Sequence, residues 1–487
     1  MKRKEDLFNL INAMSRSEKR YFTIDAQKSG KKGSKYLDLF QAINGMDEYN
    51  EAKLKKKFPK NLHSDKSYLY ETILRSMRDY RSASSRAASI KELILDYKYL
   101  YERGLYQQSE ERLKEAKDLA EIFSNSLSLL EINAEERRLL RNTKRKRYAE
   151  EIKVLIQEKQ FRLKELEAEL LYSDIAYQLS VEMQQHFEYQ NEEQRTALRA
   201  QFPESLFTPE KIPNTPYARR RFFLSGFLYF QLLGEAEKML DFCSNIVDWW
   251  DENNNFKNEE FNWYVKDMAN LLHALFRLNQ FSFIPEILRR LEKEAPTSTH
   301  DQEVFFLGTT IYRIMYYINI GDPKDGKKLI QEIDEGFQKY KMRLAPRMVL
   351  TFNSALLLFL LEDYPACIDW CDRIIKDIKS NARIDIQAGI RVLKLLATFE
   401  LEDIDTFELL YRSTYRYLTQ NLEMDKDSFE VFAAKNIFKI FQADFYEQKK
   451  LFADFRQALE DSINNKNTTV ALELDVLLLK WIETRKK

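Results

Sequence analysis

The sequence contains little glycine and little proline. Only 11 Gly and 10 Pro occur in 487 residues, against usual frequencies of about 7% and 5%. Both residues punctuate strands, turns and hairpins, so their scarcity favours long helices joined by short connections. No glycine lies between Gly104 and Gly226, and no proline lies between Pro59 and Pro203. A β-rich domain is therefore not expected in that part of the chain.

Cysteine and long apolar runs are also scarce. Three Cys in so long a chain provide no disulfide framework, which is typical of a reducing compartment. The longest purely apolar run, ALLLFLL at 355–361, is far shorter than the about 18 residues that a membrane span needs. The first residues, MKRKEDLFNLINAMSRSEKR, are basic but lack the apolar core of a signal peptide. We therefore expect a cytoplasmic protein.

Motifs for catalysis and for nucleotide or metal binding are missing or incomplete. The segment GDPKDGKK (321–328) departs from the phosphate-loop pattern because Lys328 stands where a hydroxyl must bind Mg²⁺. The four histidines are far apart, and His273 in LLHALF is typical of a core histidine. Cys367 and Cys371 lie one helical turn apart without the further ligands of a zinc site, so we expect them to pack in a core. The sequence thus predicts no enzyme, no cofactor and no metal.

Positive charge is concentrated near the start of the sequence. Residues 1–90 hold 20 Lys and Arg against 11 Asp and Glu, a net charge of +9, and the remainder carries −9. Such asymmetry is typical of a segment that faces nucleic acid. It fits equally well two parts of one protein that attract each other.

Short turn sequences recur at a nearly constant spacing, each between two helix-forming segments. The turn residues are Gly104, Gly234, Asn279, Gly321, Glu362 and Glu402. The last four steps are 45, 42, 41 and 40 residues, and the first gap leaves room for two more units near Arg145 and Gln190. A repeat of about 41 residues, each unit being a helix pair, indicates an α-solenoid.

These units resemble tetratricopeptide repeats, in which an aromatic residue follows the turn and small or apolar residues come three, seven and ten positions later. GLYQQSEERLKEA supplies Tyr106, Ser109, Leu113 and Ala116, and EDYPACIDWCDRI supplies Tyr364, Cys367, Cys371 and Ile374. The resemblance covers roughly residues 90–420. The units of this chain depart from the family pattern in two respects. Their period is longer, and their first helix lacks the usual Trp and Leu-Gly pair. The resemblance implies a right-handed superhelix of about seven or eight helix pairs that binds protein partners.

Composition divides the chain into four segments. A basic helical module (1–88) is followed by long helices forming the first repeats (89–200), a dense repeat array (217–420) and capping helices (421–487). Four of the ten prolines fall in 202–216, which predicts a loop or an inter-domain connection. The segment 146–185 predicts one long amphipathic helix with a single apolar side, formed by Ile152, Leu155, Leu163, Leu166 and Leu170. The alternative is a coiled coil, although the seven-residue repeat is not sustained over the segment.

The basic module contains two segments with the spacing of a helix-turn-helix, on either side of PKNLH. In the second, the apolar stripe is formed by Leu69, Ile73, Met77 and Tyr80, and Arg75 and Arg78 project from the other side. A DNA reader places such a helix in the major groove and uses nearby lysines on phosphates. The candidate phosphate contacts are Lys53, Lys55, Lys56, Lys57 and Lys60. The alternative is a helical cap with a solvated basic face.

Trp249 and Trp250 lie side by side in VDWWDENN, near the end of an expected helix. An exposed Trp is a common interface anchor, and the alternative is that both pack between adjacent repeats.

Together these patterns predict an all-α chain that acts as a non-enzymatic scaffold, binding a protein or peptide in its concave surface. The alternative function is a regulatory factor associated with DNA, RNA or the ribosome through residues 1–90, with the repeats as sensor or adaptor.

Overall fold

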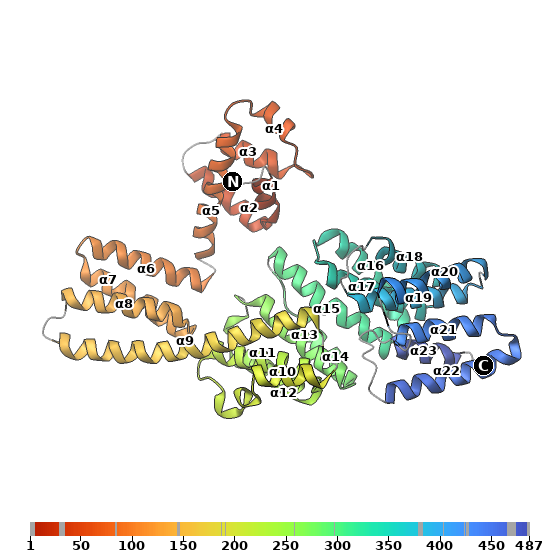
Figure 1. The fold of residues 1–487 in the computed structure, drawn as a ribbon. Helices are drawn as coiled ribbons and strands as arrows, with labels where there is room; N and C mark the ends of the chain where they lie inside the picture. The colour runs from red at the N-terminus through yellow and green to blue at the C-terminus, as the bar shows by residue number, and fades with distance from the viewer. Residues whose placement is uncertain are drawn as a thin grey trace. The chain divides into compact units, whose positions relative to one another are not determined.

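The structure is a computed structural model. It describes residues 5–28, 35–82, 85–143, 147–186, 188–189, 191–257, 259–296, 298–377, 383–402, 404–422, 424, 428–464 and 474–484. Over these residues the chain forms 23 α-helices, a few short 3₁₀ or π turns and no strand (Figure 1). The predicted all-α class is confirmed. In the same ranges, no helix has the combined length and apolarity that a membrane crossing requires.

Contacts divide the chain into two compact units. Unit 1 comprises Met1–Tyr264 and Pro296–Asp301, and unit 2 comprises Val265–Ala295 and Gln302–Lys487. The division falls within helix α13 (Phe261–Arg277). The proline-rich segment 202–216 lies inside unit 1, where it forms two 3₁₀ turns, η1 (Glu204–Phe207) and η2 (Pro209–Lys211).

Five helices at the start of unit 1 share one hydrophobic core. They are α1 (Asp6–Ala13), α2 (Arg16–Lys28), α3 (Lys35–Asn44), α4 (Glu51–Lys57) and α5 (Leu62–Ser82). The predicted stripe on α5 is confirmed, since Leu69, Ile73 and Met77 are buried in this core. The Tyr80 ring completes the stripe by packing 5.0 Å from the ring of Tyr21 on α2. The N-terminal module therefore has a core of its own.

The next helices in unit 1 begin the helix pairs. They are α6 (Arg86–Glu102), α7 (Tyr106–Ile122) and α8 (Ser126–Thr143). Ser109, Leu113 and Ala116, which match the tetratricopeptide positions, are all buried on α7. Leu113 and Ala116 pack in one cluster with Ile90 and Ile94 of α6. Apolar residues on one face of each helix thus bring the pair together.

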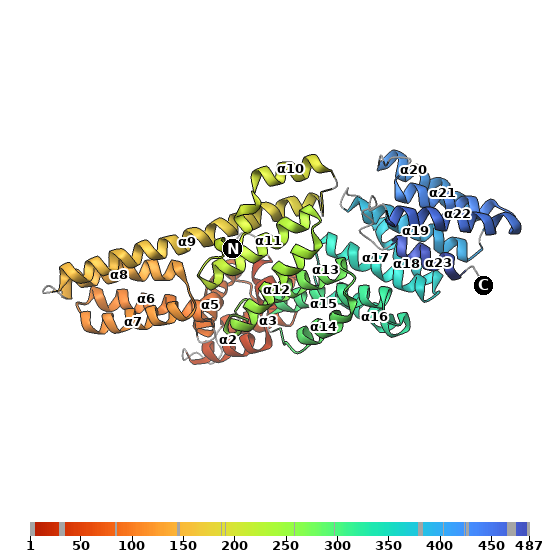
Figure 2. The same cartoon turned by 90° about the horizontal axis from the view of Figure 1, so that it is seen from below.

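The predicted long helix is confirmed as α9 (Tyr148–Gln185), an uninterrupted helix of 38 residues (Figures 1 and 2). Its first half contacts α8, where the Asn133 side chain donates to the Leu155 carbonyl over 2.9 Å. Its second half contacts α11 (Pro216–Leu233), where the Tyr172 ring meets the Phe222 ring at 5.0 Å. The remaining helices of unit 1 are α10 (Glu192–Gln201) and α12 (Ala236–Glu252), with the turn η3 (Asn254–Phe256).

Unit 2 continues as helices that pack in chain order. They are α14 (Ile284–Glu292), which follows the turn η4 (Phe281–Phe283), then α15 (Thr299–Asn319), α16 (Pro323–Lys339), α17 (Leu344–Leu360), α18 (Tyr364–Asp377), α19 (Ile384–Glu400), α20 (Ile404–Arg416) with the π turn η5 (Tyr417–Asn421), α21 (Phe429–Gln442), α22 (Phe445–Asn464) and α23 (Leu474–Thr484). One core cluster runs from Ile314 to Ile482. Helices α17 and α19 are buried on nearly every side, and most of their buried side chains are apolar.

Five of the six predicted turn residues end a helix in the left-handed conformation. Their φ angles are +75° at Gly104, +74° at Gly234, +54° at Asn279, +59° at Glu362 and +56° at Glu402. At Glu362 the amide donates to the Phe359 carbonyl and the next amide, of Asp363, donates to Leu358, both over 3.0 Å. This is the Schellman arrangement that satisfies the last carbonyls of a helix.

The turn at Gly321 is built differently, because the amides of Ile320 and Gly321 both donate to the Tyr316 carbonyl. All six predicted turns nonetheless join two helices. The further turns expected near Arg145 and Gln190 lie outside the described residues. A constant period of about 41 residues and the handedness of a superhelix stay predictions.

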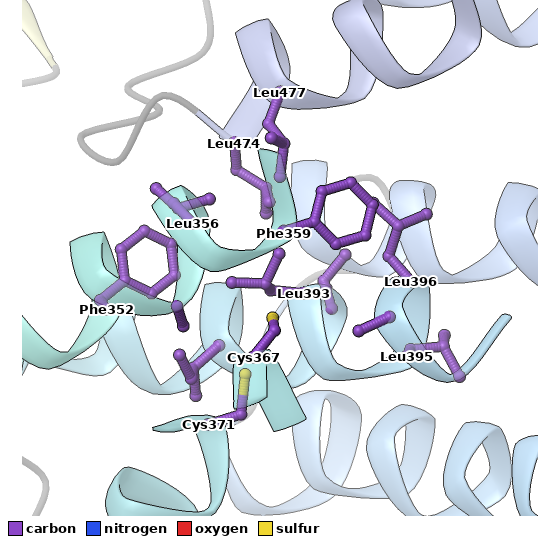
Figure 3. Close-up of a cluster of buried hydrophobic side chains, with 14 of the residues drawn as sticks. Phe352, Leu356, Phe359, Cys367, Cys371, Leu393, Leu395, Leu396, Leu474 and Leu477 are labelled. Carbon is purple, nitrogen blue, oxygen red and sulfur yellow. The ribbon is translucent and has the colours of Figure 1, made fainter. Parts of the chain in front are cut away.

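The three cysteines lie in the interior of the protein. Cys367 and Cys371 on α18 have no exposed surface and point among leucines and phenylalanines of neighbouring helices (Figure 3). Cys243 on α12 is equally buried. The prediction that they serve core packing is confirmed.

Candidate interaction surface

The adjacent tryptophans are not an exposed anchor, and that interpretation of the sequence is wrong. Trp249 is 2% exposed and Trp250 is fully buried. The chain after α12 turns back over them, so that the Phe256 ring lies 5.6 Å from Trp249, and the Tyr264 ring lies 5.4 Å from Trp250. The Arg220 guanidinium lies over the face of Trp250, 5.6 Å from its centre. Both indoles therefore stabilise unit 1.

The five candidate lysines of the N-terminal module are exposed on α4 and on the turn that follows it. Asn50 caps α4 by accepting from the Lys53 amide over 2.9 Å. Lys55 lies 3.4 Å from Glu51, one helical turn away. Within the described residues, the side chains of Lys53, Lys56 and Lys60 form no ion pair. The result is a small, densely basic patch around one short helix.

The two candidate arginines lie apart from these lysines. Arg75 and Arg78 are exposed on α5, and 13 residues separate Arg75 from the start of that helix, a rise of about 20 Å. Glu71 and Asp79 are also exposed on the same part of α5. The arginines therefore belong to a mixed-charge face, and the structure groups only the lysines.

Exposed apolar side chains are concentrated on α9. Nine of the 24 large apolar side chains that are exposed among the described residues belong to this one helix. They are Tyr148, Val154, Ile156, Phe161, Leu163, Leu170, Leu171, Tyr177 and Val181. Four of them repeat every seven residues and so follow one side of the helix, namely Ile156, Leu163, Leu170 and Tyr177. We call these four the α9 row.

The α9 row contradicts the predicted orientation of the helix. Leu163 and Leu170 were expected on the packed side, but they are 41% and 52% exposed. Ile152, Leu155 and Leu166, from the same predicted stripe, are only partly buried. In the second half of the helix the side that faces α11 carries Tyr172, Ile175, Ala176 and Leu179, which are buried.

Ion pairs, rather than apolar contacts, dominate the opposite side of the first half of α9. The Lys117 ammonium on α7 lies 3.0 Å from both Glu136 and Glu158. Burial lowers the pKa of Lys117, but its bonds to these two carboxylates outweigh burial and raise it overall. Arg162 pairs with Glu165 over 2.9 Å and also with Glu121 of α7. The packed side of this half of α9 thus carries paired charges, whereas the sequence pattern predicts leucines on the packed side.

A groove of about 340 Å³ opens where α7, α8 and the start of α9 meet. Its apolar floor is formed by Leu113, Leu139, Leu140 and Leu155. Glu136 also lines it, and burial raises the pKa of that carboxyl. Val154 of α9, which is exposed, also lines the groove.

The remaining sequence candidates have structural explanations. GDPKDGKK follows helix α15 and opens helix α16, where Asp322 accepts from the Lys324 amide over 2.9 Å, whereas a phosphate loop follows a strand. Burial, with a smaller effect of Arg277, lowers the pKa of His273 to about 3. Burial raises the pKa of the Cys371 thiol well above its usual range. In the described ranges, no three His, Cys, Asp or Glu side chains are grouped to hold a metal ion.

The sequence prediction missed Ile156 and Tyr177, although their seven-residue spacing with Leu163 and Leu170 is visible in the sequence.

The resemblance to tetratricopeptide repeats rests on the turns and on the packed positions of helices such as α7. Comparisons with protein-family models, with curated proteins and with solved structures find no match to this chain.

Proposed function

We propose that this chain is a non-enzymatic scaffold that binds protein through the exposed apolar side of α9. The observation that carries the proposal is the α9 row, four apolar side chains that are 39%, 41%, 52% and 62% exposed along one side of a long helix. Several exposed apolar side chains along one side of a helix typically mark an interaction site. A helix face with this spacing is suited to a second amphipathic helix.

The energetics favour a row over single exposed residues. Complete burial of a large apolar side chain contributes about 1.5–3 kcal/mol, so one that is already half-buried contributes about 1 kcal/mol. A single such residue does not offset the cost of association, whereas several residues along one helix do. In unit 2, by contrast, the exposed apolar residues are scattered over many elements, from Phe283 to Tyr446. This contrast favours α9 over the inner surface of the repeats, which the resemblance suggested.

The test compares the proteins that co-purify with the wild-type chain and with Leu163→Glu/Leu170→Glu. Both positions are exposed, so the variant is expected to fold, which circular dichroism and thermal unfolding would verify. The matched control is Ile404→Glu/Leu409→Glu on α20, where both residues are also exposed. The proposal predicts that protein enriched with the wild-type chain and the control, whether a foreign protein or a differently tagged second copy of the chain, is lost with the α9 variant. Equal recovery with all three chains would refute it.

A second candidate function is binding of DNA or RNA by the basic patch of α4. The observation that favours it is the exposure of five lysines within eight residues, on a module with a separate core. Phosphate binding releases counterions, so affinity is expected to fall steeply with salt. Reversing the charge of Lys55, Lys56 and Lys57 is expected to weaken binding to labelled RNA and duplex DNA. Unchanged affinity after this triple substitution would exclude α4 as the binding site.

A further inference from the structure

We infer that the partner of the α9 row is the α9 row of a second copy of this chain, running in the opposite direction. This inference rests on the proposed function, because it identifies the occupant of the same surface. It follows from three features of α9. They are the spacing of its exposed apolar residues, the separation of its charges, and the symmetry of the row and of the pair Lys159 and Asp174 about one point.

The first feature is the length and regularity of the apolar row. Ile156 and Tyr177 lie 21 residues apart, which corresponds to about 31 Å of helix. Leu163 and Leu170 lie between them, so one apolar side chain is presented at every second turn. A seven-residue repeat drifts by only about 20° per repeat around a straight helix, so the four side chains remain on one side.

The second feature is the separation of charge along the outer side of α9. Lys153, Lys159 and Lys164 flank the first half of the row, and Glu167 and Asp174 flank the second half. No acidic residue flanks the first half on this side, and residues 166–185 contain no Lys or Arg at all. Within the described chain, these five side chains form no ion pair. The outer side is therefore basic at one end and acidic at the other.

The third feature is the symmetry of the row about a point between Leu166 and Glu167. Leu163 and Leu170 are equally distant from that point, and so are Ile156 and Tyr177. Lys159 and Asp174 are a third such pair. If a second α9 lies antiparallel with this point on the two-fold axis, apolar residues face apolar residues, and each Lys159 faces the partner's Asp174. This is the self-complementary pattern that a two-fold dimer requires.

Charge favours the antiparallel pair over a parallel one, because in the antiparallel pair only Glu167, beside the axis, faces its own counterpart. In a parallel pair, the lysines of one helix would face the same lysines of the other, and the acidic residues would also meet, which costs free energy. A foreign helix would need its own matching separation of charge, whereas a second copy of α9 supplies it.

The first experiment measures self-association of the full-length chain by sedimentation equilibrium. We expect a dimer, with the dissociation constant raised about tenfold or more by Lys159→Glu or by Asp174→Lys, since each creates two like-charge contacts. The double variant Lys159→Glu/Asp174→Lys is expected to restore the dimer, because the opposite charges again face each other. A monomer up to the highest soluble concentration, or failure of the double variant to recover affinity, would overturn the inference.

The second experiment tests the direction of pairing by disulfide formation. Glu167→Cys lies beside the two-fold axis and is expected to cross-link to its counterpart under mild oxidation. Asp174→Cys is the matched control, because the two copies would lie about 22 Å apart along the axis. The native cysteines are buried and do not compete. Cross-linking of Asp174→Cys as efficiently as Glu167→Cys would indicate a parallel pair and contradict the inference.

The outcomes for the two proposals are distinguishable. A chain that stays monomeric but loses a foreign protein on Leu163→Glu/Leu170→Glu would refute self-pairing and keep the scaffold function. A chain that dimerises as described, without any foreign protein that depends on α9, would keep self-pairing and limit the surface to assembly.

Discussion

The ring of Trp249 meets the ring of Trp250 edge to face, with the centroids 4.9 Å apart and the planes at 87°. Neighbours on a helix normally point in different directions, and both can be buried only where the chain covers two sides of the helix. In unit 1, Phe256 packs on Trp249, and Tyr264 packs on Trp250. The pair is therefore a centre of stability rather than a binding anchor.

Trp250→Ala is expected to destabilise unit 1 by about 3–5 kcal/mol, the usual cost of removing a fully buried Trp. Trp250→Phe keeps part of the packing and is expected to cost less. Urea unfolding followed by circular dichroism measures both. A Trp250→Ala chain as stable as the wild type would contradict the burial described here.

The helix ends predict opposite effects of two substitutions. At Gly104, φ is +75° and an added methyl group would meet no atom within 4 Å, so Gly104→Ala is expected to cost about 1 kcal/mol through backbone strain alone. At Glu362, φ is +59°, so Glu362→Gly relieves strain and is expected to stabilise by roughly 0.5–1 kcal/mol. Thermal unfolding of the two variants measures both effects, and changes of the same sign would refute the explanation.

Burial of all three cysteines predicts slow reaction with thiol reagents. The raised pKa of Cys371 further lowers the fraction of reactive thiolate at neutral pH. We expect negligible labelling by a disulfide reagent in the folded chain and labelling of three thiols after unfolding in denaturant. Rapid labelling of a thiol without denaturant would show that the core around α18 or α12 is open.

His273 predicts a dependence of stability on pH. Its pKa is about 3 in the folded chain against an ordinary value of 6.5, so the unfolded chain binds the proton first as the pH falls. The contribution of His273 to the free energy of unfolding is complete above pH 6.5 and is lost towards pH 3. Between pH 7 and pH 5, the free energy of unfolding is expected to fall by about 2 kcal/mol because of this residue. Urea unfolding at both pH values measures this change. The free energy of unfolding is expected to differ less between pH 7 and pH 5 for His273→Gln than for the wild type. Equal differences would contradict the assignment.

Much of the fold was predictable because it depends on local rules. Turn residues such as Gly104 and Gly234 mark helix ends directly, and the absence of proline predicted an uninterrupted α9. The stripe on α5 followed from helical periodicity alone. These signals lie within a few residues of the feature that they predict.

The candidate site was harder to predict, because exposure depends on the neighbours of a helix. Leu163 and Leu170 suggested a packed side, and only the positions of α8 and α11 show that they point outwards. Glu158 and Arg162 suggested solvent, yet they form the ion pairs with α7. The tryptophans were ambiguous for the same reason, since Phe256 and Tyr264 that cover them follow in the chain.

Hydroxyl-radical footprinting of the α9 row tests most directly whether this surface binds protein. The chain is labelled once when isolated with its associated proteins and once alone at high dilution, and oxidation of Leu163, Leu170 and Tyr177 is quantified by mass spectrometry. Binding of protein at the α9 row predicts strong protection of these three side chains in the assembled state, with unchanged labelling of exposed Leu409 on α20. Equal oxidation of the α9 row in both states would contradict the claim that this surface binds protein.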